Sequence, residues 1–259
     1  MPMIPEAAYC MLACARMGLV HSVVFAGFSS ASLRDRILDA NAKLVITVNE
    51  GRRAGKAVPL KATVDMALEG VDCVHSVLVF NRSPNAEISM KEGRDLYWHE
   101  QPMNDNFVPP VHMSSEDTLF YLYTSGSTGK PKGIAHSTAG YLLYSALTFK
   151  YIFDFHPGDI FGCMADVGWI TGHSYVIYGP LCMGATTLMF ESVPTYPTPS
   201  RYWQIVQEHK LTHLYSAPTV IRVLQKMGEK HLEGFDLSSL RILGTVGEPI
   251  NPDVFIASN

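Results

Sequence analysis

The sequence has no excess of basic residues, no paired cysteines and no long apolar segment. Its 20 lysines and arginines are outnumbered by 24 aspartates and glutamates, so the formal charge is −4. This balance argues against a basic nucleic-acid-binding surface. The 5 cysteines are an odd number without a C-x-x-C pair. They predict buried thiols in a reducing compartment and provide no zinc framework.

The N-terminal stretch lacks the features of a targeting or membrane segment. No basic region precedes its apolar run, which is bracketed by Glu6 and Arg16 and is only 9 residues long. Such a run is too short to span a membrane, and it lacks the basic N-terminal region of a signal peptide. We therefore expect a core helix near 7–17 and no contact with a membrane.

Short apolar runs alternate with helical patterns along most of the chain. Continuous apolar strands between helices are typical of a parallel sheet covered on both faces. The sequence thus predicts an α/β fold of mostly parallel sheets flanked by helices. We expect strands at 22–26, 44–48, 76–80, 160–164, 185–190, 212–216 and 240–244. We expect further helices at 32–39 and 201–210, begun by Ser32 and Ser200, and at 60–68, 139–150, 178–183 and 220–227.

A loop rich in hydroxyl groups and glycine, Tyr123–Gly133, stands out from this pattern. Its glycines allow close backbone approach, so its N–H groups, hydroxyls and lysines could form a phosphate cradle. A polar hairpin turn without a ligand is the alternative. A P-loop is excluded, because only 2 residues separate Gly126 from Gly129 and proline follows Lys130. No G-x-S-x-G motif supports a serine hydrolase either.

The same loop carries a family resemblance. It reads Thr124-Ser-Gly-Ser-Thr-Gly-Lys-Pro-Lys-Gly133 and resembles the signature of the AMP-forming acyl-CoA synthetases. Three later segments are similar to the acetyl-CoA synthetases within that family, namely 136–144, 165–175 and 244–251. The resemblance implies that the chain is part of the large N-terminal domain of the adenylate-forming enzymes.

The resemblance also implies roles for individual residues, and Lys130 and Thr171 would be catalytic. The expected residues are Thr124, Ser125, Gly126, Ser127, Thr128, Gly129 and Lys130 for the ATP phosphates; Arg53, Ala54, Gly55, Lys56, Thr171 and Thr195 for coenzyme A; Gly247, Glu248 and Pro249 for the adenylate; and Ile170, Thr171 and Val246 for the acyl pocket. From charge alone, the stretch at 50–56 could equally be a solvated loop.

The implied activity is that of an acetate–CoA ligase with small-molecule substrates. Acetate would attack the α-phosphorus of ATP to give acetyl-adenylate, and the thiol of coenzyme A would then displace AMP. Two alternatives stay open: a noncatalytic nucleotide- or CoA-binding fragment or partner of the full-length enzyme, and a propionate–CoA ligase. Segments 161–166 and 179–182 look closer to a mitochondrial than to a cytosolic enzyme, so a location in the mitochondrial matrix is favoured.

The family pattern extends beyond both ends of this sequence. Residues 1–80 would hold the CoA side, 81–115 an irregular excursion or short hairpin, and 116–259 the phosphate loop and AMP-binding units. The Mg²⁺-ligating glutamate and the C-terminal domain with its catalytic lysine would lie outside the chain. We therefore expect a chain truncated at both ends that is inactive, or nearly so, by itself.

Overall fold

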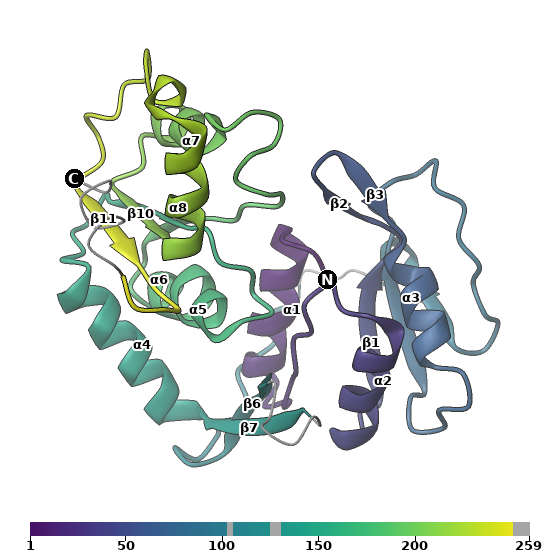
Figure 1. Cartoon of the computed structure of the whole chain (residues 1–259). Helices are drawn as coiled ribbons and strands as arrows, with labels where there is room; N and C mark the ends of the chain where they lie inside the picture. The colour runs from purple at the N-terminus through teal and green to yellow at the C-terminus, as the bar shows by residue number, and fades with distance from the viewer. Residues whose placement is uncertain (103–105, 125–130, 251–259) are drawn as a thin grey trace. The chain divides into compact units, whose positions relative to one another are not determined.

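The computed structural model describes residues 1–102, 106–124 and 131–250. The chain forms two compact units, Met1–Gly140 (unit 1) and Tyr141–Asn259 (unit 2), each with its own sheets and core (Figure 1). Among the described residues, no helix is both long and apolar enough to cross a lipid bilayer.

Unit 1 is built around a three-stranded parallel sheet in the order β1-β4-β5. Two antiparallel hairpins, β2–β3 and β6–β7, accompany this sheet. The helices are α1 (Pro5–Arg16), α2 (Ser30–Asp39) and α3 (Leu60–Ala67). The strands are β1 (Leu44–Val48), β2 (Gly51–Arg53), β3 (Lys56–Val58), β4 (Ser76–Phe80), β5 (Asp95–Tyr97), β6 (Thr118–Thr124) and β7 (Lys132–Ser137), and a 3₁₀ turn covers Trp98–Glu100.

Helices α2 and α3 cover this sheet through an aliphatic cluster. Ile37 of α2 and Val64 of α3 are buried against Val77 and Val79 of β4, which are fully inaccessible to solvent. Complete burial of such side chains stabilises a fold by about 1.5–3 kcal/mol each. The cluster therefore holds the strands from which the β2–β3 hairpin projects.

Unit 2 contains a four-stranded, fully parallel sheet in the order β11-β10-β8-β9. The strands are β8 (Ile160–Cys163), β9 (Thr186–Leu188), β10 (His213–Ser216) and β11 (Ile242–Thr245). The helices are α4 (Thr138–Ile152), which begins in unit 1, α5 (Ile170–Gly172), α6 (Gly179–Cys182), α7 (Arg201–His209) and α8 (Pro218–Met227), with a π-helical turn at His173–Tyr178 and a 3₁₀ turn at Glu229–His231.

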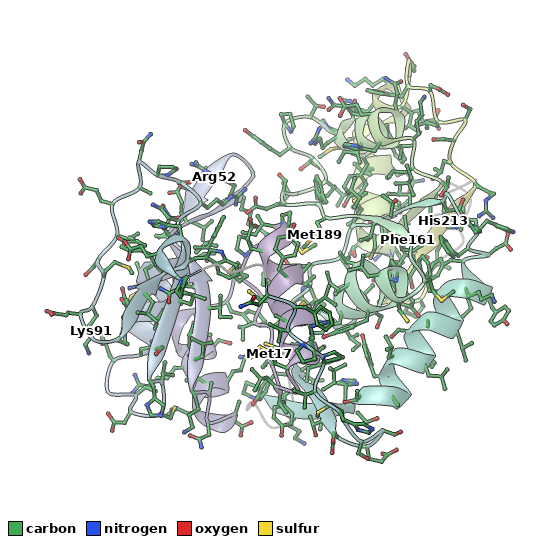
Figure 2. All side chains as sticks on the ribbon, turned by 180° about the vertical axis from the view of Figure 1, so that it is seen from behind. Met17, Arg52, Lys91, Phe161, Met189 and His213 are labelled. Carbon is green, nitrogen blue, oxygen red and sulfur yellow. The ribbon has the colours of Figure 1, made fainter. Side chains whose placement is uncertain are left out.

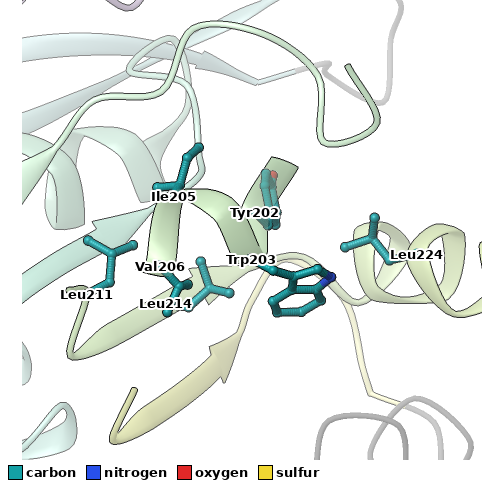
Figure 3. Packing of buried hydrophobic residues seen from close by; sticks show 7 residues of the cluster. All are labelled: Tyr202, Trp203, Ile205, Val206, Leu211, Leu214 and Leu224. Atoms are coloured by element: carbon teal, nitrogen blue, oxygen red, sulfur yellow. The ribbon is translucent and has the colours of Figure 1, made fainter. Parts of the chain in front are cut away.

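Helix α7 supplies most of the core on one side of this sheet (Figure 3). Tyr202, Trp203 and Val206 of α7 pack with Leu214 of β10 and Leu224 of α8. Helix α7 ends at Lys210, which adopts the left-handed conformation (φ 50°) and turns the chain into β10. Because β8, β10 and β11 run parallel, the loops that follow them emerge at one edge of the sheet.

The predicted α/β class and its mostly parallel sheets are confirmed, but several local predictions are wrong. Residues 22–26 form no strand; only His21 makes an isolated bridge, to Phe120. The hydroxyl of Ser29, rather than Ser32, caps α2 by accepting from the Ser32 N–H at 3.2 Å. Ser200 precedes α7 in a helical conformation and makes no side-chain cap.

Two further segments differ from expectation. The excursion expected at 81–115 contains β5, which pairs in parallel with β4 and so is not part of a hairpin. The stretch at 50–56 is not a simple loop, because Gly51–Arg53 and Lys56–Val58 pair as an antiparallel hairpin.

Candidate nucleotide site

The carboxyl edge of the sheet in unit 2 gathers the predicted acyl-pocket and adenylate residues. Ile170 and Thr171 follow β8, Thr195 follows β9, and Val246–Pro249 follow β11. Ligands of open parallel sheets bind outside this edge, at the loops that follow the strands. The sheet topology therefore supports one common edge for these residues.

The turn after β8 is tightly built. The carboxylate of Asp166 accepts a hydrogen bond from the Gly168 N–H at 2.7 Å. A Cβ on Gly172 would lie 2.1 Å from the carbonyl oxygen of Asp166, so only glycine fits there. This close approach fixes the start of α5, which carries Ile170 and Thr171.

Side chains on this turn differ sharply in exposure. Trp169 is 48% and Ile170 41% exposed, whereas His173 is fully buried. The imidazole Nδ1 of His173 lies 3.1 Å from the carbonyl oxygen of Trp169 and donates to it. This bond agrees with a structural histidine, while the exposed Ile170 is available to a ligand.

The turn after β11 is fastened to the beginning of α8. The carboxylate Oε1 of Glu248 accepts from the Thr219 N–H at 2.7 Å and from the guanidinium of Arg222 at 2.6 Å. The N-cap position of α8 is Ala217, whose side chain makes no capping hydrogen bond. Glu248 thus acts as a remote cap on a helix end that attracts negative charge.

These contacts change the electrostatics of Glu248. The hydrogen bond from Arg222 is the main reason that the pKa of the Glu248 carboxyl is lowered, and the bond from Thr219 adds to it. Both contacts favour the ionised form. Arg222 was not among the residues suggested by the sequence, because its partner lies 26 positions away and no local motif connects them.

Two other predicted residues in unit 2 are partly buried. The Val246 N–H donates to the carbonyl oxygen of Ser216 at 2.9 Å, which continues the β10–β11 pairing beyond the strand. Thr195 lies in the loop after β9, two residues before Pro197. The described contacts give Thr195 no partner that would assign it to coenzyme A.

In unit 1, the predicted CoA residues occupy the turn of the β2–β3 hairpin. Arg53 and Lys56 are cross-strand partners, and Ala54 and Gly55 between them both have positive φ, 47° and 78°. Two residues in this conformation form a tight hairpin turn. The Arg53 guanidinium carbon lies 5.6 Å from the centre of the Phe25 ring.

The β6–β7 hairpin brings together the two ends of the predicted phosphate loop. Thr124 is the last residue of β6 and pairs with Lys132, the first residue of β7. Residues 125–130, which include the predicted phosphate-binding Ser125, Gly126, Ser127, Thr128, Gly129 and Lys130, lie outside the described residues. The hairpin is compatible with both the phosphate cradle and the simple turn.

The strand end before this loop is anchored by residues that the sequence did not suggest. The Tyr123 hydroxyl donates to Asp39 at 2.6 Å, and the Arg36 guanidinium carbon lies 5.5 Å from the Tyr123 ring centre. Arg36 also lies over Phe28 at 4.7 Å. Across the hairpin, a Cβ on Gly133 would come within 3.1 Å of the Tyr123 ring.

Comparisons with known proteins agree with this arrangement. The model of a family described as AMP-binding enzyme matches residues 1–257. The chain is 57% identical over 256 residues to acetyl-coenzyme A synthetase 2 of Eremothecium gossypii and 58% identical over 259 residues to acetyl-coenzyme A synthetase of Escherichia coli K12. Each match covers 98% of this chain but only 37% and 39% of the relative.

A solved structure shows the same fold. Acetoacetyl-CoA synthetase from Streptomyces lividans superposes with a TM-score of 0.89 at 25% identity, over 99% of this chain and 39% of that protein. The predicted resemblance to the acetyl-CoA synthetases is thus confirmed at the level of sequence. Because the family model covers almost every residue and the relatives share more than half of them, the chain belongs to the AMP-binding enzyme family.

Proposed function

We propose that the chain is the nucleotide-binding portion of an AMP-forming acetate–CoA ligase. The observation that carries this proposal is the 55–58% identity to acetyl-coenzyme A synthetases from yeast and bacteria over 98% of the chain. Each of these matches covers less than two fifths of the relative's own length.

The proposed reaction joins acetate to AMP and then transfers the acetyl group to coenzyme A. Catalysis of this kind depends on positioning and on stabilising charge at phosphate oxygens, with little covalent chemistry by the protein. Thr124 through Lys130 would bind the β- and γ-phosphates and the departing pyrophosphate. Lys130 would supply the positive charge of that loop.

At the carboxyl edge of unit 2, Ile170 and Val246 would limit the acyl pocket, and Thr171 would lie where the acyl group meets the thiol. Gly247 and Pro249 would contact the adenylate through the turn after β11. The carboxylate of Glu248 is already bonded to Thr219 and Arg222. We therefore propose that Glu248 acts mainly by holding this turn in place.

The β2–β3 hairpin would bind the nucleotide phosphates of coenzyme A through Arg53, Ala54, Gly55 and Lys56, with Thr195 as a weaker candidate.

Mg²⁺ would accompany ATP and neutralise its phosphates. Among the described residues, no group of three or more histidine, cysteine, aspartate or glutamate side chains is arranged so that it could hold a metal ion. We propose that the Mg²⁺ ligand comes from another segment of the enzyme.

Titration calorimetry with AMP and with CoA, together with an acetate-dependent ATP–pyrophosphate exchange assay, tests this proposal. We expect the 259-residue chain to bind CoA or AMP with little or no exchange, because several charge stabilisers each worth roughly 10²–10³ in rate lie elsewhere in the family pattern. Absence of binding to both nucleotides would contradict the proposal. Robust exchange by the chain alone would contradict its expected inactivity.

The acyl preference and the location are finer proposals. Ile170 and Val246 favour a small acyl group, and competition between acetate and propionate in a full-length enzyme tests this preference. The mitochondrial matrix is proposed from the sequence segments at 161–166 and 179–182 alone, since the relatives compared are bacterial and fungal enzymes. Subcellular fractionation with an antibody to this chain tests it.

A further inference from the structure

Tyr123 contacts both strands that flank the expected phosphate loop. It is the last residue but one of β6 and the cross-strand partner of Gly133 in β7. A Cβ on Gly133 would come 3.1 Å from two carbons of the Tyr123 ring and 3.3 Å from its hydroxyl oxygen. The ring therefore packs over this glycine, an arrangement that fixes the pairing of two strands. Tyr123 thus joins the strand that enters the loop to the strand that leaves it.

The hydroxyl group of Tyr123 connects this hairpin to helix α2. It donates a hydrogen bond of 2.6 Å to the carboxylate of Asp39, the last residue of α2. Hydrogen bonds to an ionised carboxylate are short and stronger than those between neutral groups. Burial and the bond to Asp39 raise the pKa of Tyr123, so the hydroxyl keeps its proton and remains the donor.

Arg36 holds the ring of Tyr123 on the side of α2. Its guanidinium carbon lies 5.5 Å from the centre of the Tyr123 ring, and a cation over an aromatic face is attracted to it. The guanidinium group is itself fixed, because it lies over the Phe28 ring and donates to two oxygens of Ser32. Arg36 is only 7% exposed. Tyr123 is therefore held from three directions, by Gly133, Asp39 and Arg36.

Helix α2 gives these contacts a rigid base. Ile37, which lies between Arg36 and Asp39 in the sequence, is buried in the same cluster as Val77 and Val79 of β4. Close packing of this kind allows little movement of the helix. The positions of Arg36 and Asp39 are thus set by the core of unit 1, and Tyr123 transmits them to the hairpin.

We propose that Tyr123, held by Asp39, is a positioning residue that orients the phosphate loop for the β- and γ-phosphates of ATP. The inference rests on the proposed function, which gives these phosphates to the loop. Tyr123 would act through the loop without contacting the nucleotide. Holding both strands at the ends of the loop lowers the entropy lost when a ligand orders it.

This role predicts a selective effect on ligands. ATP and pyrophosphate carry the phosphates that the loop would bind, whereas AMP lacks both. A link that served only the stability of the hairpin would not distinguish these ligands. The ratio of ATP affinity to AMP affinity is therefore the decisive readout.

The test is titration calorimetry of the 259-residue chain with ATP, inorganic pyrophosphate, AMP and CoA. The variants are Tyr123→Phe, Asp39→Ala, Asp39→Asn and the double variant Tyr123→Phe/Asp39→Ala. Tyr9→Phe is the matched control for loss of a hydroxyl, because Tyr9 is 60% exposed on α1 of the same unit. Lys91→Met controls for a change of one charge, at an exposed position before β5 (Figure 2). Thermal unfolding verifies that each variant is folded.

We expect Tyr123→Phe and Asp39→Ala each to weaken ATP and pyrophosphate binding about tenfold, because a hydrogen bond to a charged group is lost. AMP binding should not change. Asp39→Asn should recover part of the lost affinity, since its amide oxygen still accepts from the hydroxyl. The double variant should bind no more weakly than either single variant, because both remove the same bond.

Three results would overturn this inference and leave the proposed function standing. The first is equal weakening of ATP and AMP binding. The second is ATP binding by Tyr123→Phe or by Asp39→Ala that equals that of the two controls. The third is an unmodified chain that binds AMP or CoA but neither ATP nor pyrophosphate. If the unmodified chain binds none of the four ligands, the proposed function falls and the inference falls with it.

Discussion

Glu248 and Arg222 are joined by a hydrogen bond of 2.6 Å between the carboxylate Oε1 and the guanidinium Nη2. The same oxygen accepts from the Thr219 N–H, so the turn after β11 and the start of α8 share one acceptor. Glu248, which the family resemblance predicts to contact the adenylate, is thus a structural link between the turn after β11 and helix α8.

We predict that Glu248→Gln lowers the thermal unfolding midpoint of unit 2 and weakens AMP binding. A neutral amide is a poorer partner for Arg222 and for the helix end.

The contribution of Glu248 to stability also depends on pH. The pKa of Glu248 is lowered in the folded chain, so the ionised carboxylate stabilises unit 2 fully above the ordinary glutamate pKa, and this stabilisation is lost as the pH falls through the lowered value. The difference in unfolding midpoint between the wild-type chain and Glu248→Gln should therefore become smaller as the pH is lowered. Glu233→Gln, at an exposed position in the same unit, is the control; equal midpoints for the two variants at neutral pH would contradict the prediction.

We predict that Asp95→Asn destabilises unit 1 by about 3 kcal/mol, because it breaks a buried ion pair. The Asp95 carboxylate contacts Lys61 at 2.8 Å and Arg94 at 2.6 Å, and the side chains of Asp95 and Lys61 are 0% and 1% exposed. Urea unfolding measures the change. Asp72→Asn, at an exposed aspartate of unit 1, should cost far less.

The same ion pair makes the stability of unit 1 depend on pH. Burial alone would raise the pKa of Asp95, but hydrogen bonds from Arg94 and Lys61 outweigh it and lower the pKa to about 2. The ordinary value is 3.8. Ionised Asp95 thus contributes about 2 kcal/mol to the free energy of unfolding of unit 1. This contribution is fully present above pH ~4 and is lost as the pH falls toward 2. Asp95→Asn should show no such loss, and an identical acid profile for both proteins would refute the assignment.

We predict that Gly172→Ala destabilises unit 2 by about 3 kcal/mol or more, because the new methyl group would meet the backbone oxygen of Asp166 at 2.1 Å. The clash displaces Thr171 and should also weaken ligand binding at the carboxyl edge. Gly140→Ala is the matched change: its Cβ would meet only the Ser137 hydroxyl, at 3.1 Å. Helix propensity makes that change neutral or stabilising by up to about 1 kcal/mol. Similar losses in both variants would argue against the backbone clash.

We predict that Arg36→Lys destabilises unit 1 by about 2 kcal/mol although the charge is kept. Arg36 is 7% exposed and lies over the rings of Phe28 and Tyr123. Its guanidinium also donates to the Ser32 carbonyl and hydroxyl oxygens, at 2.7 and 2.6 Å. An ammonium group cannot stack and bond in this manner. Arg34→Lys, on the same helix, should change the unfolding free energy little; a small effect at Arg36 would contradict the stacking account.

The sequence predicts the alternation of strands and helices well because each of the long runs has one clear period. It fails where tertiary contacts decide the conformation. The run at 22–26 is apolar enough for a strand, yet Phe25 and Phe28 pack edge to face at 5.6 Å and lie beneath Arg53 and Arg36. Strand β5 has only three residues, and its pairing with β4 is invisible in the local pattern.

The candidate site likewise contains residues that the sequence predicts and residues that only the folded structure reveals. The resemblance predicts roles for Thr124, Thr171 and Glu248, because each lies in a continuous stretch of sequence that resembles a family motif. Arg222 and Arg36 carry no motif; each contacts a residue that folding brings from elsewhere in the chain, Glu248 for Arg222 and Tyr123 for Arg36. Only the three-dimensional structure reveals these partners.

The central claim is that this chain forms the ATP- and CoA-binding portion of an acetate–CoA ligase. The most direct measurement replaces the matching segment of the Escherichia coli acetyl-coenzyme A synthetase, 58% identical, with this chain and follows acetate-dependent ATP–pyrophosphate exchange. We predict exchange within about tenfold of the parent enzyme, a barrier change of roughly 1.4 kcal/mol, with acetate preferred over propionate. A soluble, folded hybrid that binds ATP but shows no acetate-dependent exchange would contradict the account.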